Sequence, residues 1–227
     1  MNADKNVTVI FIEEGSGGSG TILREYWTGI SCTSISSLTS SSNYPDNPTG
    51  SEEITSLEGP VNWADNYGTR IRGYVFPPVT GNYTFWIAGD DYCNLYLSTD
   101  ATAANASRIA YVEGWTDSEE WTKYSSQESS TVTLTAGEKY YIEVLHKEGS
   151  GGDNIAVAWQ GPGISQSVID GAYLSPYETS NNTTQYTLSS SVSGSGSISL
   201  SPSGGIYDEG TVVTVNAIAD NGYQFSA

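Results

Sequence analysis

The sequence predicts an all-β protein, with a β-sandwich or jelly-roll barrel at its centre and partial small β-repeat segments at both ends. The 227 residues include 25 Gly, 16 Tyr and 6 Trp, a composition that favours strands and tight turns over helices. Apolar residues alternate with polar ones along many short segments, which is the period of a half-buried strand. Turns rich in Gly, Pro and Asn separate these segments at the spacing typical of sandwiches and barrels.

Period-two alternation predicts eight strands in the central part of the chain. They span residues 21–27, 70–76, 83–88, 94–98, 108–112, 131–135, 139–146 and 155–160. Within the seventh strand, Tyr140, Ile142 and Val144 share one face.

Four tryptophans are expected to be buried in the core: Trp27, Trp63, Trp86 and Trp159. A single helical turn is expected within residues 115–124. Thr116 or Asp117 can cap such a turn, and Glu119 or Glu120 can reach back to the cap.

The two ends of the chain contain short strands and glycine-rich turns. Residues 1–12 read as a polar turn and one strand, and three more strands are expected at 185–190, 195–201 and 211–217. SPSGG at 201–205, YDEGTVV at 207–213 and NGYQF at 221–225 resemble the internalin-type B repeats of bacterial surface proteins. In that family a strand introduced by a sequence like MNADK, here residues 1–5, closes the repeat.

The resemblance implies that residues 1–12 are the closing strand of a preceding repeat and that residues 185–227 are an incomplete repeat. The chain is then a piece of a longer tandem protein, whose other domains are its neighbours. The alternative is a complete short protein with frayed tails. Polar and Gly/Ser-rich linkers are expected at 13–19 and 179–184, which leaves 20–178 as one central domain.

The central domain resembles the PA14 domain, a β-sandwich module named from a bacterial toxin. The matching pieces are GTILREYW at 20–27, NWADNYG at 62–68, RGYV at 72–75, PPVTGNYTF at 77–85, GDD at 89–91, LYLS at 95–98, LTAGEKYY at 134–141 and HKEGSGGDN at 146–154. They follow one another in order and cover roughly residues 20–177. Such modules occur in toxins, glycosidases, adhesins and large surface proteins, so function has to be argued from the site.

The charge of the chain excludes several kinds of partner. The 26 acidic residues outnumber the 8 basic ones and give a net charge of −18, which argues against nucleic acid and against anionic lipid surfaces. No run of 18 apolar residues exists, so membrane insertion is not expected. The acidic surplus serves either solubility or the binding of a hard cation such as Ca²⁺.

Cysteine and histidine are too few for a zinc or haem site. Cys32 and Cys93 do not form a CxxC pair, and His146 is the single histidine. Cys32 and Cys93 form a disulfide or remain reduced; the sequence favours neither.

Asp90 and Asp91 are the candidate binding residues, because two adjacent carboxylates at a strand end repel each other unless they are solvated or neutralised by a cation. Ca²⁺ takes six to eight oxygen ligands, so a second source of oxygens is needed. The loop at 149–154 is the natural supplier, since Asp153 and Asn154 add side-chain oxygens and its glycines let carbonyls turn inward. The alternative is that Asp90-Asp91 merely shapes a turn.

The PA14 resemblance sharpens this interpretation. In the sugar-binding branch of that family, a matching Asp-Asp pair is joined by a cis peptide, both carboxylates hold Ca²⁺, and a second loop contributes an Asn. Vicinal sugar hydroxyls fill the remaining positions. The resemblance implies that Asp90, Asp91 and Asp153 or Asn154 hold Ca²⁺, and that the partner is a polysaccharide or glycan. Tyr92 and Trp115 are candidates for stacking on the sugar ring.

Catalysis is not expected. A glycosidase needs a defined pair of carboxylates across a cleft, and no pair can be singled out here; no GxSxG elbow precedes a helix. Two hypotheses remain. In the first, the domain is a Ca²⁺-dependent, lectin-like module of a secreted or cell-surface bacterial protein. In the second, it is a structural spacer or protein-contact module in a surface adhesin stalk, without sugar binding.

Overall fold

The computed structural model describes residues 7–9, 18–177, 185–190, 192, 194–208 and 211–223. The chain divides into two compact units: Gly15–Tyr177, and Met1–Glu14 together with Glu178–Ala227. The predicted linker at 179–184, and that at 13–19 apart from its last two residues, lie outside the described residues.

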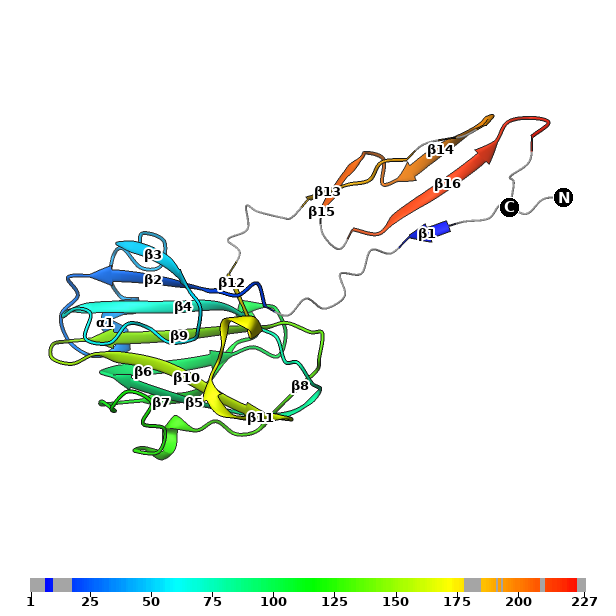
Figure 1. Ribbon diagram of the computed structural model, residues 1–227. Helices are drawn as coiled ribbons and strands as arrows, with labels where there is room; N and C mark the ends of the chain where they lie inside the picture. Colours follow the sequence, from blue (N-terminus) through cyan, green and yellow to red (C-terminus); the bar gives the residue numbers. More distant parts are fainter. Residues whose placement is uncertain are drawn as a thin grey trace. The chain divides into compact units, whose positions relative to one another are not determined.

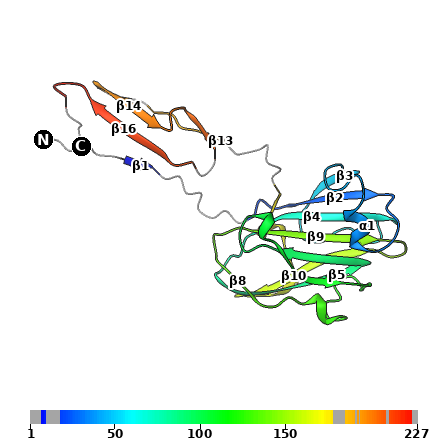
Figure 2. The same cartoon turned by 180° about the vertical axis from the view of Figure 1, so that it is seen from behind.

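The larger unit contains a seven-stranded sheet of order β3-β2-β4-β9-β6-β7, with β12 added beside β4 (Figures 1 and 2). Its strands are β2 (Ile22–Thr28), β3 (Gly50–Ile54), β4 (Tyr67–Val75), β6 (Tyr92–Leu97), β7 (Ser107–Val112), β9 (Tyr140–Glu148) and β12 (Leu174–Pro176). All the pairings within this sheet are antiparallel.

A second, four-stranded sheet of order β11-β10-β5-β8 packs against the first. Its strands are β5 (Gly81–Asp90), β8 (Val132–Leu134), β10 (Asn154–Gly161) and β11 (Ile164–Val168). One buried cluster unites inward-facing residues of both sheets, such as Ile142 and Val144 of β9 and Val157 and Trp159 of β10. The predicted all-β sandwich is therefore confirmed.

Helices are few and short. Helix α1 (Ile35–Thr39) packs on β9, β4 and β6, and Leu38 is its one buried residue. Three 3₁₀ turns follow: η1 (Ala103–Asn105), η2 (Ser125–Gln127) and η3 (Gly171–Tyr173). No helix among the described residues has the length and apolar character needed to cross a membrane.

All eight predicted central strands are present, with ends that differ by a few residues. The strands that the alternation missed are β3, β11 and β12. The first two have mostly exposed residues at their centres, so their side chains carry no apolar period. β12 has only three residues and ends in Pro176.

Two local expectations need correction. No helix forms at 115–124, but Asp117–Glu120 makes a single turn: the Glu120 N–H donates to the Asp117 carbonyl at 3.1 Å, and Glu120 Oε2 accepts from the Asp117 N–H at 3.0 Å, which is the predicted reach-back. Thr116 does not cap it, because its hydroxyl is buried and accepts a hydrogen bond from the Gly89 N–H at 2.9 Å. Trp63 is 38% exposed: its ring meets Tyr26 and Tyr67 edge-on and has the Arg24 guanidinium 4.5 Å from its centroid, but the rest of it is open to solvent. The other three tryptophans are buried, as predicted.

The chain crosses between the two sheets twice at one end of the sandwich. β5 ends at Asp90 and β6 begins at Tyr92 in the other sheet, so Asp91 alone forms the first crossover. β9 ends at Glu148 and β10 begins at Asn154, which makes 149–153 the second crossover. Because β5 pairs with β10 and β6 pairs with β9, the two crossovers lie side by side.

The smaller unit contains a three-stranded sheet of order β1-β16-β14 and a separate pair, β13 with β15. The strands are β1 (Val7–Val9), β13 (Gln185–Thr187), β14 (Gly196–Ser201), β15 (Ile206–Asp208) and β16 (Val213–Ala219). The three predicted C-terminal strands are thus present, and β15 was not anticipated. β1 pairs antiparallel with β16, with Val7 opposite Val215; that it closes a preceding repeat stays a prediction.

The structure resolves the open question about the cysteines. Cys32 is exposed and Cys93 is fully buried, and both are free thiols. Burial raises the pKa of the Cys93 thiol, which keeps it protonated as a small core residue.

A buried ion-pair network stabilises the outer face of the larger sheet. The Glu25 carboxylate accepts hydrogen bonds from Nε of Arg70 and Nε of Arg72, each at 2.8 Å. Glu25 is 7% exposed and Arg70 is 5% exposed, so removing one partner leaves buried positive charge without compensation.

We therefore expect Glu25→Gln to lower the free energy of unfolding by about 3 kcal/mol, as measured by urea denaturation. Glu138→Gln, at an exposed residue, is the control and should change it little. Equal unfolding midpoints for the two variants would show that the network does not stabilise the sheet.

Candidate functional site

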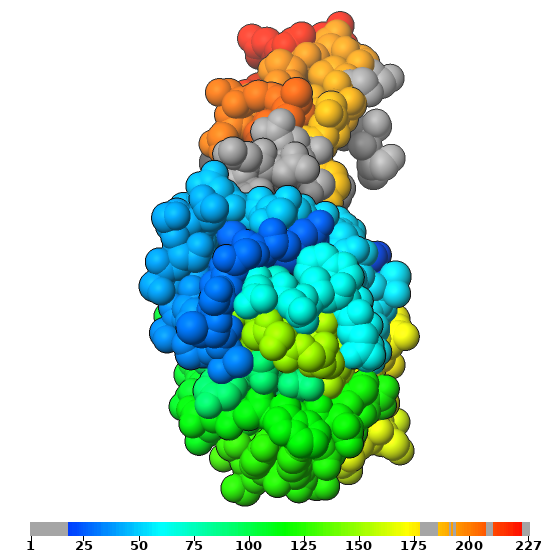
Figure 3. All heavy atoms as spheres, turned by 90° about the vertical axis from the view of Figure 1, so that its left-hand side faces the viewer, coloured from blue at the N-terminus to red at the C-terminus, as the bar shows by residue number. Residues whose placement is uncertain are grey.

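The two crossovers bring acidic residues together at one end of the sandwich. Asn154 lies opposite Asp90 in the β5–β10 register. In the β6–β9 register Tyr92 lies opposite Lys147, so Asp91 and Glu148 follow as neighbours. Figure 3 looks onto this end, where the yellow-green segment around residue 150 packs among the cyan segment before β4 and the green segment after β5.

Asp90, Asp91 and Glu148 form a compact carboxylate cluster. One carboxylate oxygen of each lies within 4.8 Å of the others, and the Asp90–Asp91 peptide is cis. Asp91 Oδ2 accepts a hydrogen bond from the Gly149 N–H at 3.0 Å. The absence of a side chain at Gly149 leaves room for this contact, since a Cβ would come within 2.9 Å of Thr33 Cγ2 and 3.2 Å of Asp91 Oδ2.

The pKa values of two carboxyl groups in the cluster, those of Asp90 and Glu148, are raised. Burial raises the pKa of Asp90 to about 6, and the charges of Asp91 and Asp153 add to the effect. Burial raises the pKa of Glu148 to about 8, again with contributions from Asp91, Asp90 and Asp153; the Asp91 backbone N–H opposes this shift. Two unit charges 4 Å apart repel by about 4 kcal/mol at an effective dielectric constant of about 20, so the cluster is costly without a cation.

No basic side chain of the described residues forms an ion pair with the cluster, although the charge of Lys123 lowers the pKa of Asp90. Among the described residues, none of the ion pairs involves Asp90, Asp91 or Glu148. Lys147 is buried next to the cluster, but its Nζ donates to the Glu148 backbone carbonyl, and burial lowers its pKa.

His146 fixes the backbone of the acidic pair. It is fully buried, and its Nε2 lies 2.7 Å from the Asp90 carbonyl oxygen. Burial lowers the pKa of His146 to about 4, so the neutral ring donates from Nε2 to this carbonyl and leaves Nδ1 without a partner. His146 therefore positions Asp90 and is not available as a general base.

The 149–153 loop is held in place by residues 62–66, the segment that precedes β4. Asp153 Oδ2 accepts hydrogen bonds from the backbone N–H groups of Trp63 and Ala64 at 2.7 and 3.0 Å. In addition, the Gly151 N–H donates to Asp65 Oδ1 at 3.1 Å. Two backbone bonds add to these three: the Asn62 N–H donates to the Asp153 carbonyl at 2.9 Å and the Asn66 N–H to the Gly149 carbonyl at 2.7 Å. Five such bonds would be costly to lose together, so the loop has a defined conformation.

The two remaining predicted ligands differ in how their oxygens are used. Asn154 Nδ2 donates to the Thr116 carbonyl at 2.9 Å, while its Oδ1 is buried and has no hydrogen-bond partner. Asp153 uses Oδ2 for the loop and keeps Oδ1 buried without a partner. The structure thus brings Asn154 beside the cluster and gives Asp153 a bracing role; metal binding by Asp153 stays a prediction.

The predicted aromatic contacts flank the cluster. Tyr92 is half-buried at the start of β6. Trp115 is 51% exposed, and its backbone bridges to Asp90. The Lys123 ammonium lies 2.9 Å from the centroid of one Trp115 ring face. The exposed part of such an aromatic ring can stack on an apolar ligand face.

These residues fit a hard divalent cation. Carboxylate and amide oxygens are the ligands that Ca²⁺ prefers, and buried polar groups normally have partners. The unpartnered oxygens of Asn154 and Glu148 are therefore explained if a cation binds beside Asp90 and Asp91.

Sequence reasoning missed Glu148 and the bracing role of residues 62–66. Extending the alternation of Tyr140, Ile142 and Val144 by two more steps places His146 and Glu148 on the same inner face, which is where the structure has them. The bracing contacts join residues about 90 positions apart, and no local pattern reports such contacts.

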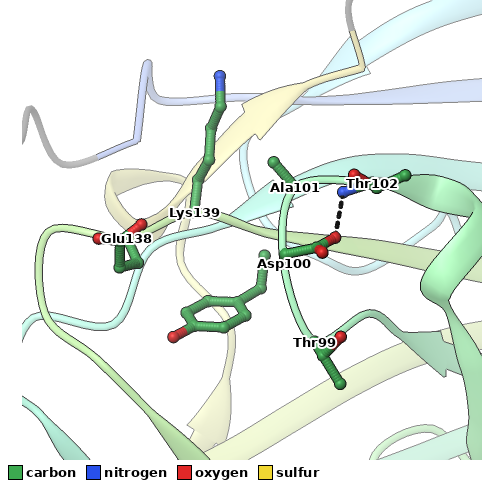
Figure 4. Close-up of a pocket in the computed structure, with 7 residues that line it drawn as sticks. Thr99, Asp100, Ala101, Thr102, Glu138 and Lys139 are labelled. Atoms are coloured by element: carbon green, nitrogen blue, oxygen red, sulfur yellow. Dashed lines mark hydrogen bonds between the residues drawn. The ribbon is translucent and has the colours of Figure 1, made fainter.

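A shallow hollow elsewhere on the domain has no comparable chemistry. Thr99–Thr102 and Glu138–Tyr140 line it (Figure 4). It lies at the start of β9, the opposite end of the strand from Glu148. Asp100 is satisfied there by Ser98, Thr102 and Asn105.

Comparisons with known proteins agree with this architecture. The profile of the PA14 domain matches residues 20–172, and that of the divergent InlB B-repeat domain matches residues 186–227. The mouse protein N-acetyl-beta-glucosaminyl-glycoprotein 4-beta-N-acetylgalactosaminyltransferase 1 is 34% identical over 172 residues, which are 73% of this chain and 16% of that protein. The chain thus spans a small part of this relative.

Two solved structures share the fold. The PA14 sugar-binding domain from an RTX adhesin superposes with a TM-score of 0.53 at 10% identity, over 70% of this chain and 99% of that one. The epithelial adhesin 6 A domain of Candida glabrata, in complex with Galb1-3GlcNAc, superposes with a TM-score of 0.52 at 14% identity, over 73% of this chain and 90% of that one.

The bracing role of Asp153 is testable without metal. In EDTA we expect Asp153→Ala to lower the free energy of unfolding by about 2 kcal/mol, because two charge-assisted hydrogen bonds are lost. Asp153→Asn keeps one acceptor oxygen and should lose roughly half as much. Amide exchange at Trp63 and Ala64 should accelerate in the Ala variant; unchanged exchange there would contradict the assignment.

Proposed function

Because the chain belongs to the PA14 domain family, we propose that its central domain is a Ca²⁺-dependent carbohydrate-binding module. One observation carries this proposal: Asp90 and Asp91 lie at the first crossover beside Asn154, whose Oδ1 is buried and has no hydrogen-bond partner. Asp91 forms the first crossover, Asp90 and Asn154 are the strand ends beside the two crossovers, and a cation between them would satisfy all three.

The role of Ca²⁺ in such a site is to offer coordination positions to the hydroxyl groups of a sugar. Asp90, Asp91 and Asn154 would hold the ion. His146 fixes the Asp90 carbonyl, and residues 62–66 hold the second loop. The protein's own contribution is thus a rigid set of oxygens, which lowers the ordering cost of binding.

Aromatic residues at the rim supply the apolar part of the site. Trp115, exposed and joined to Asp90 through a backbone bridge, is the residue we assign to stacking on the sugar ring, and Tyr92 is a second contact. Trp63 adds a third exposed ring, and its backbone N–H donates to Asp153 Oδ2 in the loop.

Two related structures support a glycan partner. One is described as a sugar-binding domain and the other is a complex with Galb1-3GlcNAc; both share only the fold with this chain. The name of the mouse relative describes a glycosyltransferase, but the matched segment is 16% of that protein. We assign no catalysis to this domain, because its one histidine is buried and bonded to a backbone carbonyl.

The adhesin domains and the flanking repeat favour an extracellular or cell-surface protein as the parent, and we infer a bacterial one from the repeat. The alternative is a spacer or protein-contact module in a surface stalk. It differs from the first proposal in one respect that can be measured, namely whether glycans bind.

Calcium dependence is tested by thermal unfolding. We expect Ca²⁺ to raise the melting temperature relative to EDTA, since a ligand that binds only the folded state stabilises it. Asp91→Ala should abolish the shift, and Glu113→Gln, at an exposed residue, should retain it. A wild-type protein with equal melting temperatures in Ca²⁺ and in EDTA would refute the metal site.

Glycan binding is tested on an array in Ca²⁺ and in EDTA. We expect binding by the wild type that EDTA and Asp90→Ala abolish; silence in both conditions favours the spacer.

The aromatic contact has its own test on any glycan so identified. Trp115→Ala should weaken binding roughly tenfold, the effect of losing about 1.4 kcal/mol of stacking, and should leave the Ca²⁺-induced thermal shift intact. If affinity is unchanged, Trp115 does not contact the sugar.

A further inference from the structure

We propose that Glu148 is a third carboxylate ligand of the cation, reaching it from inside the sandwich. This inference rests on the proposed Ca²⁺ site and extends it to a residue outside the two surface loops. The cation would then be part of the connection between the two sheets as well as part of the binding surface.

The position of Glu148 on β9 directs its side chain inward. Side chains alternate between faces along a strand, and Ile142 and Val144 of the same strand are fully buried in the core. His146 and Glu148 continue that face and are likewise 0% exposed. Glu148 is therefore the last inward residue before the chain leaves the sheet.

Both carboxylate oxygens of Glu148 are buried and have no hydrogen-bond partner among the described residues. The nearest basic residue in sequence, Lys147, points to the other face of the strand, and its Nζ binds a backbone carbonyl. Arg24, on the inner side, is engaged by Glu52 and Thr69. The Asp91 backbone N–H favours the charged form of Glu148, and the Lys147 ammonium interacts with it electrostatically, but burial outweighs both, so this carboxyl is costly to ionise without a cation.

A cation at the cluster resolves this cost. One oxygen of Glu148 already lies within 4.8 Å of an oxygen of Asp90 and of an oxygen of Asp91, so small side-chain movements bring all three onto one ion. Three carboxylates and the Asn154 amide supply about four of the six to eight oxygens that Ca²⁺ takes. The positions that remain can accept backbone or sugar oxygens.

The third carboxylate has two opposite consequences. Without metal, burial and the charges of Asp90 and Asp91 disfavour its ionised form, so its charge either opposes folding or is lost by protonation; with metal the carboxylate adds attraction and tightens binding. A residue with a purely structural role would affect both states in the same direction. This difference in sign makes the assignment testable.

The experiment compares the full chain with Glu148→Gln, which keeps the shape and removes the charge. Calcium affinity is measured by isothermal titration, and melting temperature is measured in EDTA and in saturating Ca²⁺. Glu113→Gln is the matched control, because it removes one negative charge from an exposed residue in the segment after β7.

We expect Glu148→Gln to weaken Ca²⁺ binding at least tenfold, to melt in EDTA at a temperature no lower than the wild type, and to gain less from Ca²⁺. The control should match the wild type in all three measurements. If Glu148→Gln binds Ca²⁺ with the affinity of the wild type, the assignment of Glu148 is wrong, while the proposed function still stands. Absence of Ca²⁺ binding by the wild type refutes the metal site itself.

A second measurement needs no variant, in case Glu148→Gln fails to fold. In a crystal structure of the wild type grown with Ca²⁺, an oxygen of Glu148 should lie about 2.3–2.6 Å from the ion. A Glu148 carboxylate that remains outside the coordination sphere would overturn the inference.

Discussion

The site depends on a constraint of chain topology: the polypeptide passes between the two sheets twice at the same end of the sandwich. The first passage uses one residue, Asp91, and the second uses residues 149–153. Because the strands on either side of these passages are hydrogen-bonded partners, the passages are held side by side. The residues at their ends are therefore fixed relative to one another by backbone hydrogen bonds, before any side chain is considered.

The acidic residues at those strand ends repel one another, and this repulsion costs folding free energy that the rest of the structure offsets. His146 is neutral because burial lowers its pKa, so it offers a hydrogen bond to the Asp90 carbonyl but no positive charge. The basic residues closest to the cluster have other partners. The domain thus keeps a group of carboxyl groups with raised pKa values and no ion pair in a partly buried place, an arrangement that makes this end of the sandwich a candidate functional site.

The loop at 149–153 is held in its conformation by residues 62–66, a distant part of the chain. Asp153 resembles a ligand in the sequence, yet one of its oxygens binds the backbone of Trp63 and Ala64. A carboxylate that orders a loop in this way acts on the ligand indirectly, by fixing the direction of its neighbour Asn154. Trp63, whose backbone takes part in these contacts, keeps its side chain partly exposed and outside the core.

The sequence by itself determined the fold class, the eight main strands and the order of the two kinds of module, and it singled out Asp90, Asp91 and Asn154 as candidate ligands. These follow from local alternation, turn composition and motif order, which are all short-range properties of the chain. Only the tertiary structure decided that Glu148 joins the acidic pair, that Asp153 braces a loop, that Trp63 is exposed and that the cysteines are separate. Each of these depends on which strands are neighbours and in what register, and register is set by contacts between residues far apart in the sequence.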